Sequence, residues 1–441
     1  MSVFKSYDIR GLCPEDLTED LAKRIGAATA RYLKAKKLIV GWDMRPTSVM
    51  LRDAFICGAN SEGCVCIDVG MCTTPLTYWA VQHYESDGSV MMTGSHNPAE
   101  YNGMKICAAG PVALSYEGGL NEVEKIILSD DLPLVENKEI TNEVVDPWLG
   151  YKAHLLKFAK NWKPFKIVVD AANGMGGIGV QKVFDAYGGE IVPMYFDPDG
   201  RFPNHEANPL KLECVQDLIA KVKDEKADFG VAFDGDADRF ALIDEKGGVV
   251  PCDLLTALFA ELLLQEEQAG GVIYDLRSSH IVPETIEKCG GKAYRERVGH
   301  SHMKKTLRET GAIFGGELSG HFYFRDHANS DSGLLAFVLM LNFLSNTDKT
   351  LSELIDPYRV YHHSGEINFT IEDKDAMIKK AGERYSSGKK DELDGLTVEF
   401  EDWWFNIRKS NTEPKLRLNL EAASAELCQE KLVELKELLV E

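Results

Sequence analysis

The sequence lacks any apolar run approaching the length of about 18 residues that a membrane-spanning helix needs. Its first ten residues have neither the basic start nor the apolar centre of a secretory signal peptide. Since both signals are missing, we expect a protein of the cytoplasm that does not enter a membrane.

Paired cysteines are also lacking. The chain has 10 cysteines, but it contains no CxxC pair, and only Cys64 and Cys66 lie close together in the sequence. Most of the cysteines stand in apolar surroundings, where small buried hydrophobic side chains are typical. This pattern favours a reducing compartment without disulfides.

Basic residues are in deficit, because 49 Lys and Arg stand against 70 Asp and Glu and give a formal net charge of −21. Nucleic acids and anionic membranes bind basic surfaces, so both are disfavoured as partners. No feature of the sequence indicates an obligate protein partner. The same negative charge repels an anionic small substrate, so a phosphorylated ligand would need a local cluster of Arg, Lys and metal ion.

The composition is that of a globular protein, with 44% apolar and 27% charged residues among 441. At about 150 residues per domain, this length predicts three or four domains. Strand-like and helix-like segments alternate as far as residue 360, which predicts βαβ units and largely parallel sheets. Beyond it, apolar residues recur at every second position, which predicts antiparallel strands with helices on one face. We expect three similar mixed α/β domains at 1–143, 144–248 and 249–360 and a C-terminal α+β domain at 361–441, arranged around a central cleft.

A turn bearing a serine follows the strand-like run at residues 89–92. Gly94 ends this run, and Ser95, His96 and an Asn-Pro turn come next. Such a turn would lift Ser95 away from the end of the sheet. The alternative is an ordinary polar loop, since loops at strand ends are rich in these residue types.

Three aspartates, Asp234, Asp236 and Asp238, alternate directly after the apolar run at residues 229–233. Crowded carboxylates repel one another, and their oxygens are ligands that Mg²⁺ prefers, so this loop predicts a magnesium site. An EF-hand is excluded because Arg239 stands where that loop requires Gly. A dehalogenase-type phosphatase with Asp234 as nucleophile remains an alternative.

Two later segments carry donors suited to a phosphorylated sugar. Residues 408–414 offer a guanidinium, hydroxyls and an amide, which are groups that bind phosphate oxygens. Glu317 and Ser319 stand two positions apart and suit neighbouring sugar hydroxyls. By contrast, the glycines at 174–179, with Asp197 about twenty residues on, fit a dinucleotide-binding fingerprint. The alternative for these glycines is a turn that packs a helix closely against a strand.

Five segments in this order resemble the α-D-phosphohexomutases, and among them the phosphomannomutase/phosphoglucomutase group: residues 7–11, 93–98, 234–239, 317–321 and 408–414. The resemblance covers nearly the whole chain. It implies that Ser95 is phosphorylated in the active enzyme and binds one Mg²⁺ together with Asp234, Asp236 and Asp238. The further catalytic residues that it implies are Arg10, His96, Lys105, Arg239 and His300. The substrate-binding residues that it implies are Tyr7, Arg277, Glu317, Ser319, His321, Arg408, Ser410, Asn411 and Thr412.

The implied reaction interconverts hexose 1-phosphate and hexose 6-phosphate. Phosphoserine 95 would phosphorylate the free hydroxyl of the substrate and form a hexose 1,6-bisphosphate, which reorients and returns its other phosphate to Ser95. Lys105 and His300 are both candidates for the general base. Residues 275–279 and 323–326 resemble the phosphomannomutase branch, so we expect mannose as the preferred sugar and activity on glucose as well. The C-terminal domain is expected to close over the sugar about a hinge at residues 358–365.

Overall fold

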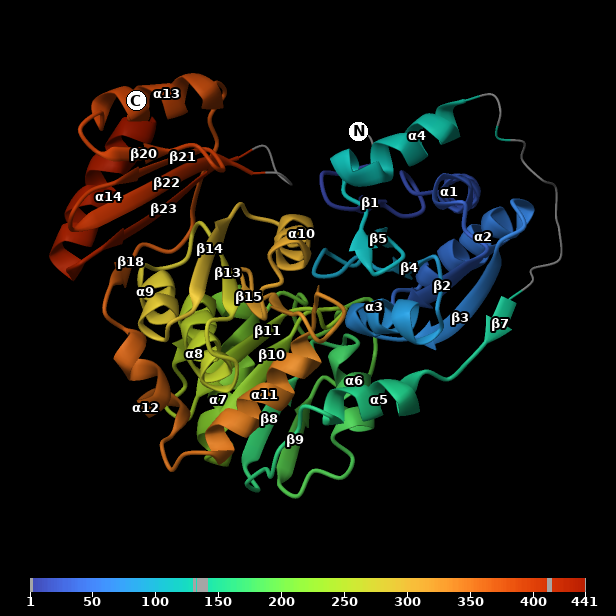
Figure 1. The fold of residues 1–441 in the computed structure, drawn as a ribbon, viewed down its shortest axis with the longest axis horizontal. Coiled ribbons are helices and arrows are strands. Elements are labelled where there is room, and N and C mark those ends of the chain that lie inside the picture. The colour runs from blue at the N-terminus through green and yellow to red at the C-terminus, as the bar shows by residue number, and fades with distance from the viewer. Residues whose placement is uncertain (1–2, 130–131, 133–141, 411–414, 441) are drawn as a thin grey trace.

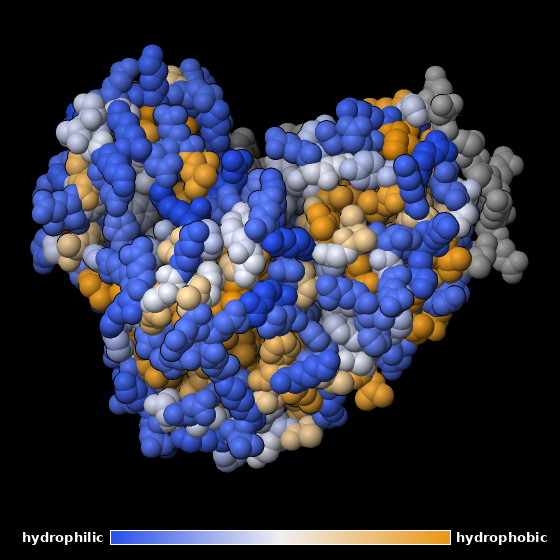
Figure 2. All heavy atoms as spheres, in the orientation of Figure 1, coloured by the Kyte–Doolittle hydropathy of each residue, from blue (hydrophilic) through white to orange (hydrophobic). Residues whose placement is uncertain are grey.

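The computed structural model describes residues 3–129, 132, 142–410 and 415–440. The predicted fold class is confirmed: three α/β domains are followed by a C-terminal domain with an antiparallel sheet. In Figure 1 the first domain (blue to cyan) and the C-terminal domain (red) stand on opposite sides, above the second and third domains. Figure 2 shows the surface hollowed between the first and the C-terminal domains on this face. In the part of the chain described here, no helix has the length and apolar character needed to cross a membrane.

The first domain contains a sheet with the strand order β1-β5-β4-β2-β3-β7, and β6 pairs with β5. Strands β2, β3 and β4 are connected by helices, whereas β5 returns antiparallel to β4 and so places residues 93–100 in the turn between them. The strands are β1 (Ile9–Leu12), β2 (Lys37–Trp42), β3 (Val65–Met71), β4 (Gly88–Met92), β5 (Tyr101–Ala108), β6 (Val112–Ala113) and β7 (Asn142–Val144). The helices are α1 (Glu19–Leu33), α2 (Ser48–Ser61), α3 (Thr74–His83) and α4 (Asn121–Leu128), with a π-helical turn at Tyr116–Leu120. The predicted domain boundary between residues 143 and 144 falls within β7, which pairs with β3.

The second domain has the strand order β12-β11-β10-β8-β9. Its strands are β8 (Lys166–Asp170), β9 (Glu190–Met194), β10 (Phe229–Phe233), β11 (Phe240–Asp244) and β12 (Val249–Val250). Its helices are α5 (Trp148–Leu156), α6 (Gly176–Val183) and α7 (Gln216–Glu225), with a 3-10 turn at Leu212–Val215 before α7. Strand β10 is buried along its whole length because helices and neighbouring domains cover both faces of the sheet.

The glycines of this domain serve close packing. A Cβ on Gly174 would lie 2.7 Å from the carbonyl oxygen of Gly235, and one on Gly176 would lie 2.9 Å from Cβ of Phe233. Side chains at these positions would push α6 away from β10 and from the aspartate loop that follows it. The packing alternative therefore accounts for the glycine segment without a dinucleotide.

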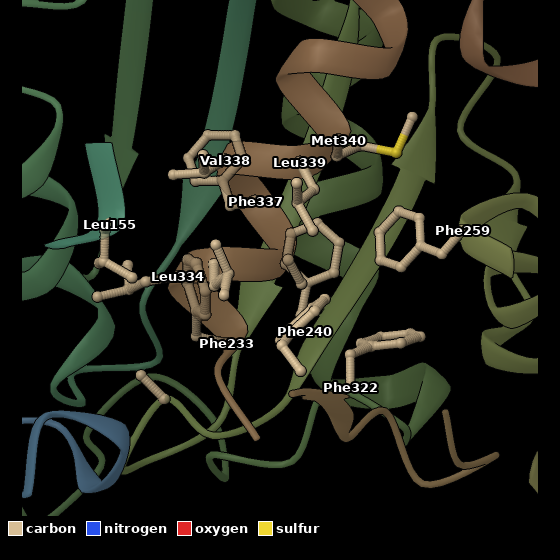
Figure 3. Close-up of a cluster of buried hydrophobic side chains, with 14 of the residues drawn as sticks. Leu155, Phe233, Phe240, Phe259, Phe322, Leu334, Phe337, Val338, Leu339 and Met340 are labelled. Atoms are coloured by element: carbon tan, nitrogen blue, oxygen red, sulfur yellow. The ribbon is translucent and has the colours of Figure 1, made fainter. Parts of the chain in front are cut away.

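The third domain has the strand order β14-β13-β15-β16-β17. Its strands are β13 (Gly271–Asp275), β14 (Lys292–Glu296), β15 (Phe314–Gly316), β16 (Phe322–Phe324) and β17 (Ser330–Asp331). Its helices are α8 (Cys252–Glu266), α9 (Ile281–Lys288), α10 (His300–Thr310), α11 (Gly333–Ser345) and α12 (Leu351–Ile355), followed by a 3-10 turn at Asp356–Tyr358. Helix α11 is apolar on all sides and is buried, as such helices are. Its Phe337 ring lies 4.5 Å from Phe184 and 6.3 Å from Phe240 between ring centroids, so α11 joins the cores of the second and third domains (Figure 3).

The C-terminal domain has a separate core beneath its antiparallel sheet, which has the order β18-β23-β22-β21-β20, with β19 also paired to β23. Its strands are β18 (His362–His363), β19 (Ile367–Phe369), β20 (Lys389–Asp391), β21 (Leu396–Glu399), β22 (Trp403–Lys409) and β23 (Leu416–Ala422). Its helices are α13 (Lys374–Arg384) and α14 (Ala425–Val440). The alternating Leu416, Leu418 and Leu420 point into this core, as the period of two predicts.

Candidate active site

Ser95 lies in the turn between β4 and β5, residues 93–100, which we call the serine turn. It faces the aspartate loop of the second domain, residues 234–239 between β10 and β11. Its Oγ donates a hydrogen bond to Oδ2 of Asp234 over 3.0 Å and lies 3.4 Å from Nδ1 of His96. The backbone of Ser95 has a φ of 48°, in the left-handed region that residues other than glycine seldom adopt. Such strained backbone persists only where surrounding contacts impose it, and it is common at functional sites.

The aspartate loop follows β10 and brings three buried carboxylates together. Oxygens of Asp234, Asp236 and Asp238 all lie within 4.8 Å of one another. Burial and the neighbouring carboxylates of Asp238 and Asp236 raise the pKa of Asp234 well above its ordinary value. Oδ1 of Asp236 and Oδ1 of Asp238 are buried and have no hydrogen-bond partner among the described residues. Buried carboxylate oxygens need a partner, and a hard divalent cation such as Mg²⁺ fits this donor set.

Cationic side chains from the first domain border these carboxylates. Nζ of Lys105, on β5, lies 2.6 Å from Oδ2 of Asp236 and 2.6 Å from Oδ2 of Asp238. Burial acts against the charge on Lys105, but the two aspartates outweigh it and raise the pKa of this lysine. Arg10, on β1, donates from Nη1 to the carbonyl oxygen of Thr93 over 3.0 Å, next to the serine turn.

Arg239 completes this group at the end of the aspartate loop. Its backbone N–H donates to Oδ1 of Asp234 over 3.2 Å, and its Nε lies 3.9 Å from Oδ2 of the same residue. Arg10, Lys105 and Arg239 thus form the local cationic cluster that a phosphorylated ligand requires in a chain with a net charge of −21.

The predicted sugar loop lies between β15 and β16, and its residues contact one another. Oε1 of Glu317 accepts a hydrogen bond from the N–H of Gly299 over 3.0 Å, and Oε2 accepts one from the hydroxyl of Tyr323. Oγ of Ser319 lies 2.9 Å from Nδ1 of His321. Nε2 of His321 lies 3.3 Å from Oδ1 of Asp238, so the sugar loop adjoins the aspartate loop.

Tyr7 and His300 close the interface between the first and third domains. The hydroxyl of Tyr7 donates to the carbonyl oxygen of Val298 over 2.8 Å. The ring of His300, at the start of α10, lies 5.7 Å from that of Tyr7 and 6.4 Å from that of His321. Burial, together with Lys304 and Lys105, lowers the pKa of His300 well below its ordinary value.

The predicted phosphate-binding arginines meet at a residue that sequence reasoning missed. Nη2 of Arg408 lies 2.9 Å and Nη1 of Arg277 lies 3.4 Å from Oε2 of Glu366, and Nη1 of Arg417 lies 2.8 Å from Oε1. Glu366 comes directly after the expected hinge at residues 358–365. Because its carboxylate contacts both Arg277 of the third domain and Arg408 of the C-terminal domain, it joins these two domains. Ser410 donates its backbone N–H to the carbonyl oxygen of Lys415 over 2.9 Å. The predicted ligands Asn411 and Thr412 lie outside the described residues.

Arg45 is the second residue that sequence reasoning missed. Its buried guanidinium donates to carbonyl oxygens of the serine turn and of Tyr101. In the sequence, the one feature that could have indicated a role for Arg45 is its place in the segment Asp-Met-Arg directly after β2. A separate cavity of about 560 Å³ lies elsewhere, at the junction of the second and third domains, and none of the predicted site residues lines it.

Comparison with known proteins identifies the family. Residues 1–133, 150–248 and 251–361 match alpha/beta/alpha domains I, II and III of phosphoglucomutase/phosphomannomutase, and residues 366–438 match its C-terminal domain. A phosphomannomutase of Methanocaldococcus jannaschii is 39% identical over 444 residues, which cover 100% of this chain and 98% of the relative. A phosphomannomutase of Escherichia coli is 38% identical over 433 residues, which cover 96% of this chain and 95% of the relative.

A solved structure of a phosphoglucomutase/phosphomannomutase family protein from Burkholderia thailandensis superimposes with a TM-score of 0.91 at 31% identity, covering 99% of this chain and 96% of that one. Neither the phosphatase nor the dinucleotide-binding alternative finds support in these comparisons. The chain therefore belongs to the phosphoglucomutase/phosphomannomutase family of hexose phosphate mutases.

Proposed function

We propose that Ser95 carries the transferred phosphoryl group and that the substrates are hexose 1-phosphates and hexose 6-phosphates. The observation that carries this proposal is the 3.0 Å contact between Oγ of Ser95 and Oδ2 of Asp234. The nearby Lys105, Arg10 and Arg239 support it, because phosphoryl transfer depends on positioning and on neutralising charge rather than on covalent chemistry by the protein.

Asp234, Asp236, Asp238 and the phosphorylated Ser95 would hold one Mg²⁺. When bound there, the ion would neutralise charge on the phosphoryl group. Oδ1 of Asp236, which is buried and accepts no hydrogen bond from the described residues, supports this assignment. A hexose 1,6-bisphosphate would serve both as the intermediate and as the compound that first phosphorylates Ser95.

The other site residues would bind the transferred phosphoryl group, the sugar and the second phosphate. Arg10, Lys105 and Arg239 hold the phosphoryl oxygens, and His96 borders Oγ of Ser95. Glu317 and Ser319, with Tyr7 and His321 beside them, hold the sugar while the bisphosphate reorients. The phosphate that does not react would be held by Arg277, Arg408, Ser410, Asn411 and Thr412.

Of the two candidates for the general base, we assign the role to His300. Burial lowers the pKa of His300, so its ring is neutral and can accept the proton of the sugar hydroxyl. Lys105 is held protonated by Asp236 and Asp238, which suits it to binding phosphoryl oxygens instead.

Mannose is the proposed preferred sugar, with glucose as a second substrate. The full-length relatives at 39% and 38% identity are named phosphomannomutases, which supports this order. Mannose and glucose differ at C2 alone, so a site that holds the other hydroxyls accepts both sugars. The ten free cysteines support the further proposal of a reducing compartment, the cytoplasm.

The C-terminal domain is proposed to close over the bound sugar about residues 358–365. Its separate core supports this motion, since a domain with its own core can move as a unit. Gly365, with a φ of 69°, stands at the end of the segment in a conformation that favours glycine.

The test follows mannose 1-phosphate and glucose 1-phosphate separately by phosphorus NMR, with Mg²⁺ and a trace of hexose 1,6-bisphosphate. The expected result is conversion to the 6-phosphates without free phosphate, faster for mannose, and its loss in Ser95→Ala. Release of free phosphate that survives Ser95→Ala would overturn the proposal and point to Asp234 as a nucleophile.

A further inference from the structure

Arg45 connects the strand end of β2 to the serine turn some fifty residues later in the chain. Its side chain is fully buried beside that of Asp43. Nη1 donates to the carbonyl oxygens of Pro98 and Tyr101, each over 2.7 Å. Nη2 donates to the carbonyl oxygens of Ser95 over 3.0 Å and Asn97 over 2.6 Å. One guanidinium therefore binds three backbone carbonyls of the turn and a fourth at the first residue of β5.

The surrounding residues are shaped to admit this guanidinium. A Cβ on Gly94 would lie 2.4 Å from Cζ of Arg45, so the residue before Ser95 leaves room for the side chain. Asp43 accepts from the backbone N–H groups of Arg45 over 3.0 Å and of Gly94 over 3.3 Å, and so ties the two segments together. These contacts fix the turn through its backbone, independently of the side chain of Ser95.

The second domain holds Arg45 from the other side. A Cβ on Gly200 would lie 2.5 Å from Cα of Arg45, and the ring of Phe202 lies 5.0 Å from its Cζ. Arg45 thus lies between the serine turn of the first domain and a loop of the domain that supplies the aspartates. A shift of either domain would be transmitted to the backbone of Ser95.

We propose that Arg45 is a positioning residue that fixes the position and orientation of Ser95 Oγ relative to the aspartate loop for phosphoryl transfer. The left-handed backbone of Ser95 needs external contacts to persist, and the carbonyl oxygen of Ser95 itself binds Nη2. In a trans peptide the N–H points opposite to the preceding C=O, so the same contact directs the N–H of His96 away from Arg45. A displacement of about 1 Å in such a group can cost roughly 100-fold in rate.

Lysine cannot replace this arrangement. A guanidinium presents five N–H donors in a fixed plane, whereas an ammonium presents three on a single atom. Arg45→Lys keeps the charge but cannot reach these four carbonyls. The substitution therefore tests the geometry of the guanidinium contacts while the positive charge at position 45 is kept.

The test measures kcat and KM for mannose 1-phosphate in Arg45→Lys, with melting temperatures to establish the folded fraction. The expected result is a fall in kcat of about 100-fold, with KM changed by less than about threefold. Guanidinium added to Arg45→Ala should restore part of kcat, and urea at the same concentration should not. The matched control is Arg52→Lys, since Arg52 lies in the same domain over the ring of Trp42, and its kcat should be unchanged.

Gly200→Ala provides a second test if Arg45→Lys does not fold. Its added methyl would displace Arg45 from the side of the second domain while the guanidinium is retained, and kcat should again fall more than KM rises. Retention of kcat in both variants, or loss in proportion to the unfolded fraction, would overturn the proposal. The proposal rests on Ser95 as the phosphoryl carrier, which Ser95→Ala tests separately: an inactive Ser95→Ala beside an active Arg45→Lys would refute the role of Arg45 alone.

Discussion

Lys105 and Asp236 form a buried ion pair across the boundary between the first and second domains, with Nζ 2.6 Å from Oδ2. Lys105 projects from β5 and Asp236 follows β10, so the pair joins two sheets. The same ammonium lies 2.6 Å from Oδ2 of Asp238. One lysine thus balances part of the charge of three carboxylates, and the rest of that charge is available to a divalent cation.

Replacing Lys105 with Met should destabilise the protein more without Mg²⁺ than with it. Removing one partner of a buried ion pair costs about 3–5 kcal/mol, because the other charge is left uncompensated. Mg²⁺ bound to the aspartates would compensate that charge, so the gain in Tm from EDTA to Mg²⁺ should be larger in Lys105→Met than in the wild type. Lys125→Met is the control, since Lys125 forms an exposed pair with Glu122 and such pairs contribute little. No gain in Tm from Mg²⁺ in either protein would argue against metal at the aspartates, and equal gains in both would argue against compensation of the lysine charge by the metal.

Glu366→Gln should weaken phosphate binding. Arg277 and Arg408 approach the same oxygen of Glu366, so the carboxylate orients guanidinium groups of two domains toward each other. Without the charge, we expect KM for mannose 1-phosphate and the inhibition constant of inorganic phosphate to rise roughly tenfold, which corresponds to about 1.4 kcal/mol. The change in kcat should be smaller. The exposed Glu401 of the same domain provides the control, Glu401→Gln, and an unchanged KM in Glu366→Gln would contradict the assignment.

The sequence predicted the parts of the site that lie directly after apolar runs. Ser95 follows β4 and Asp234 follows β10. An apolar run that ends in polar residues can be recognised from the sequence alone. The fold class was predictable for the same reason, since strands and helices alternate with distinct periods. That the two loops face each other was inferred from the family resemblance alone, because a contact between domains leaves no pattern in either local sequence. The structure supplies the distance, 3.0 Å between Oγ of Ser95 and Oδ2 of Asp234.

Arg45 and Glu366 were not predictable from their own segments. Arg45 acts on backbone carbonyls, which every residue has, so the serine turn carries no side-chain signal of its partner. Glu366 lies in a short polar segment between β18 and β19, and its role depends on arginines more than forty residues away in either direction. Side-chain chemistry shows what a residue can bind, and the fold alone decides which distant group it meets.

Glu317→Gln should slow the reaction with both sugars by a similar factor. The proposed role of Glu317 is to bind hydroxyls that mannose and glucose share, and the loss of a charge-assisted hydrogen bond costs about 1.5–3 kcal/mol. We therefore expect kcat/KM to fall roughly 10- to 150-fold with mannose 1-phosphate and glucose 1-phosphate alike. Unchanged rates would refute sugar binding by Glu317, and a loss confined to one sugar would show that Glu317 senses C2 instead.

The rate should fall on the acidic side only below the ordinary titration range of histidine. Burial, with Lys304 and Lys105, lowers the pKa of His300, so its neutral form persists as the pH falls past 6.5, the ordinary value. Because a general base must be unprotonated, the acidic limb of kcat/KM should lie below pH 6.5, and activity should be lost only as the pH falls through the lowered pKa.

In His300→Gln, kcat should fall about 10²- to 10⁴-fold and this limb should disappear. His302→Gln, two residues further along the same helix, should keep both the rate and the limb. An acidic limb that survives in His300→Gln would assign the proton transfer to another group, with Lys105 the next candidate.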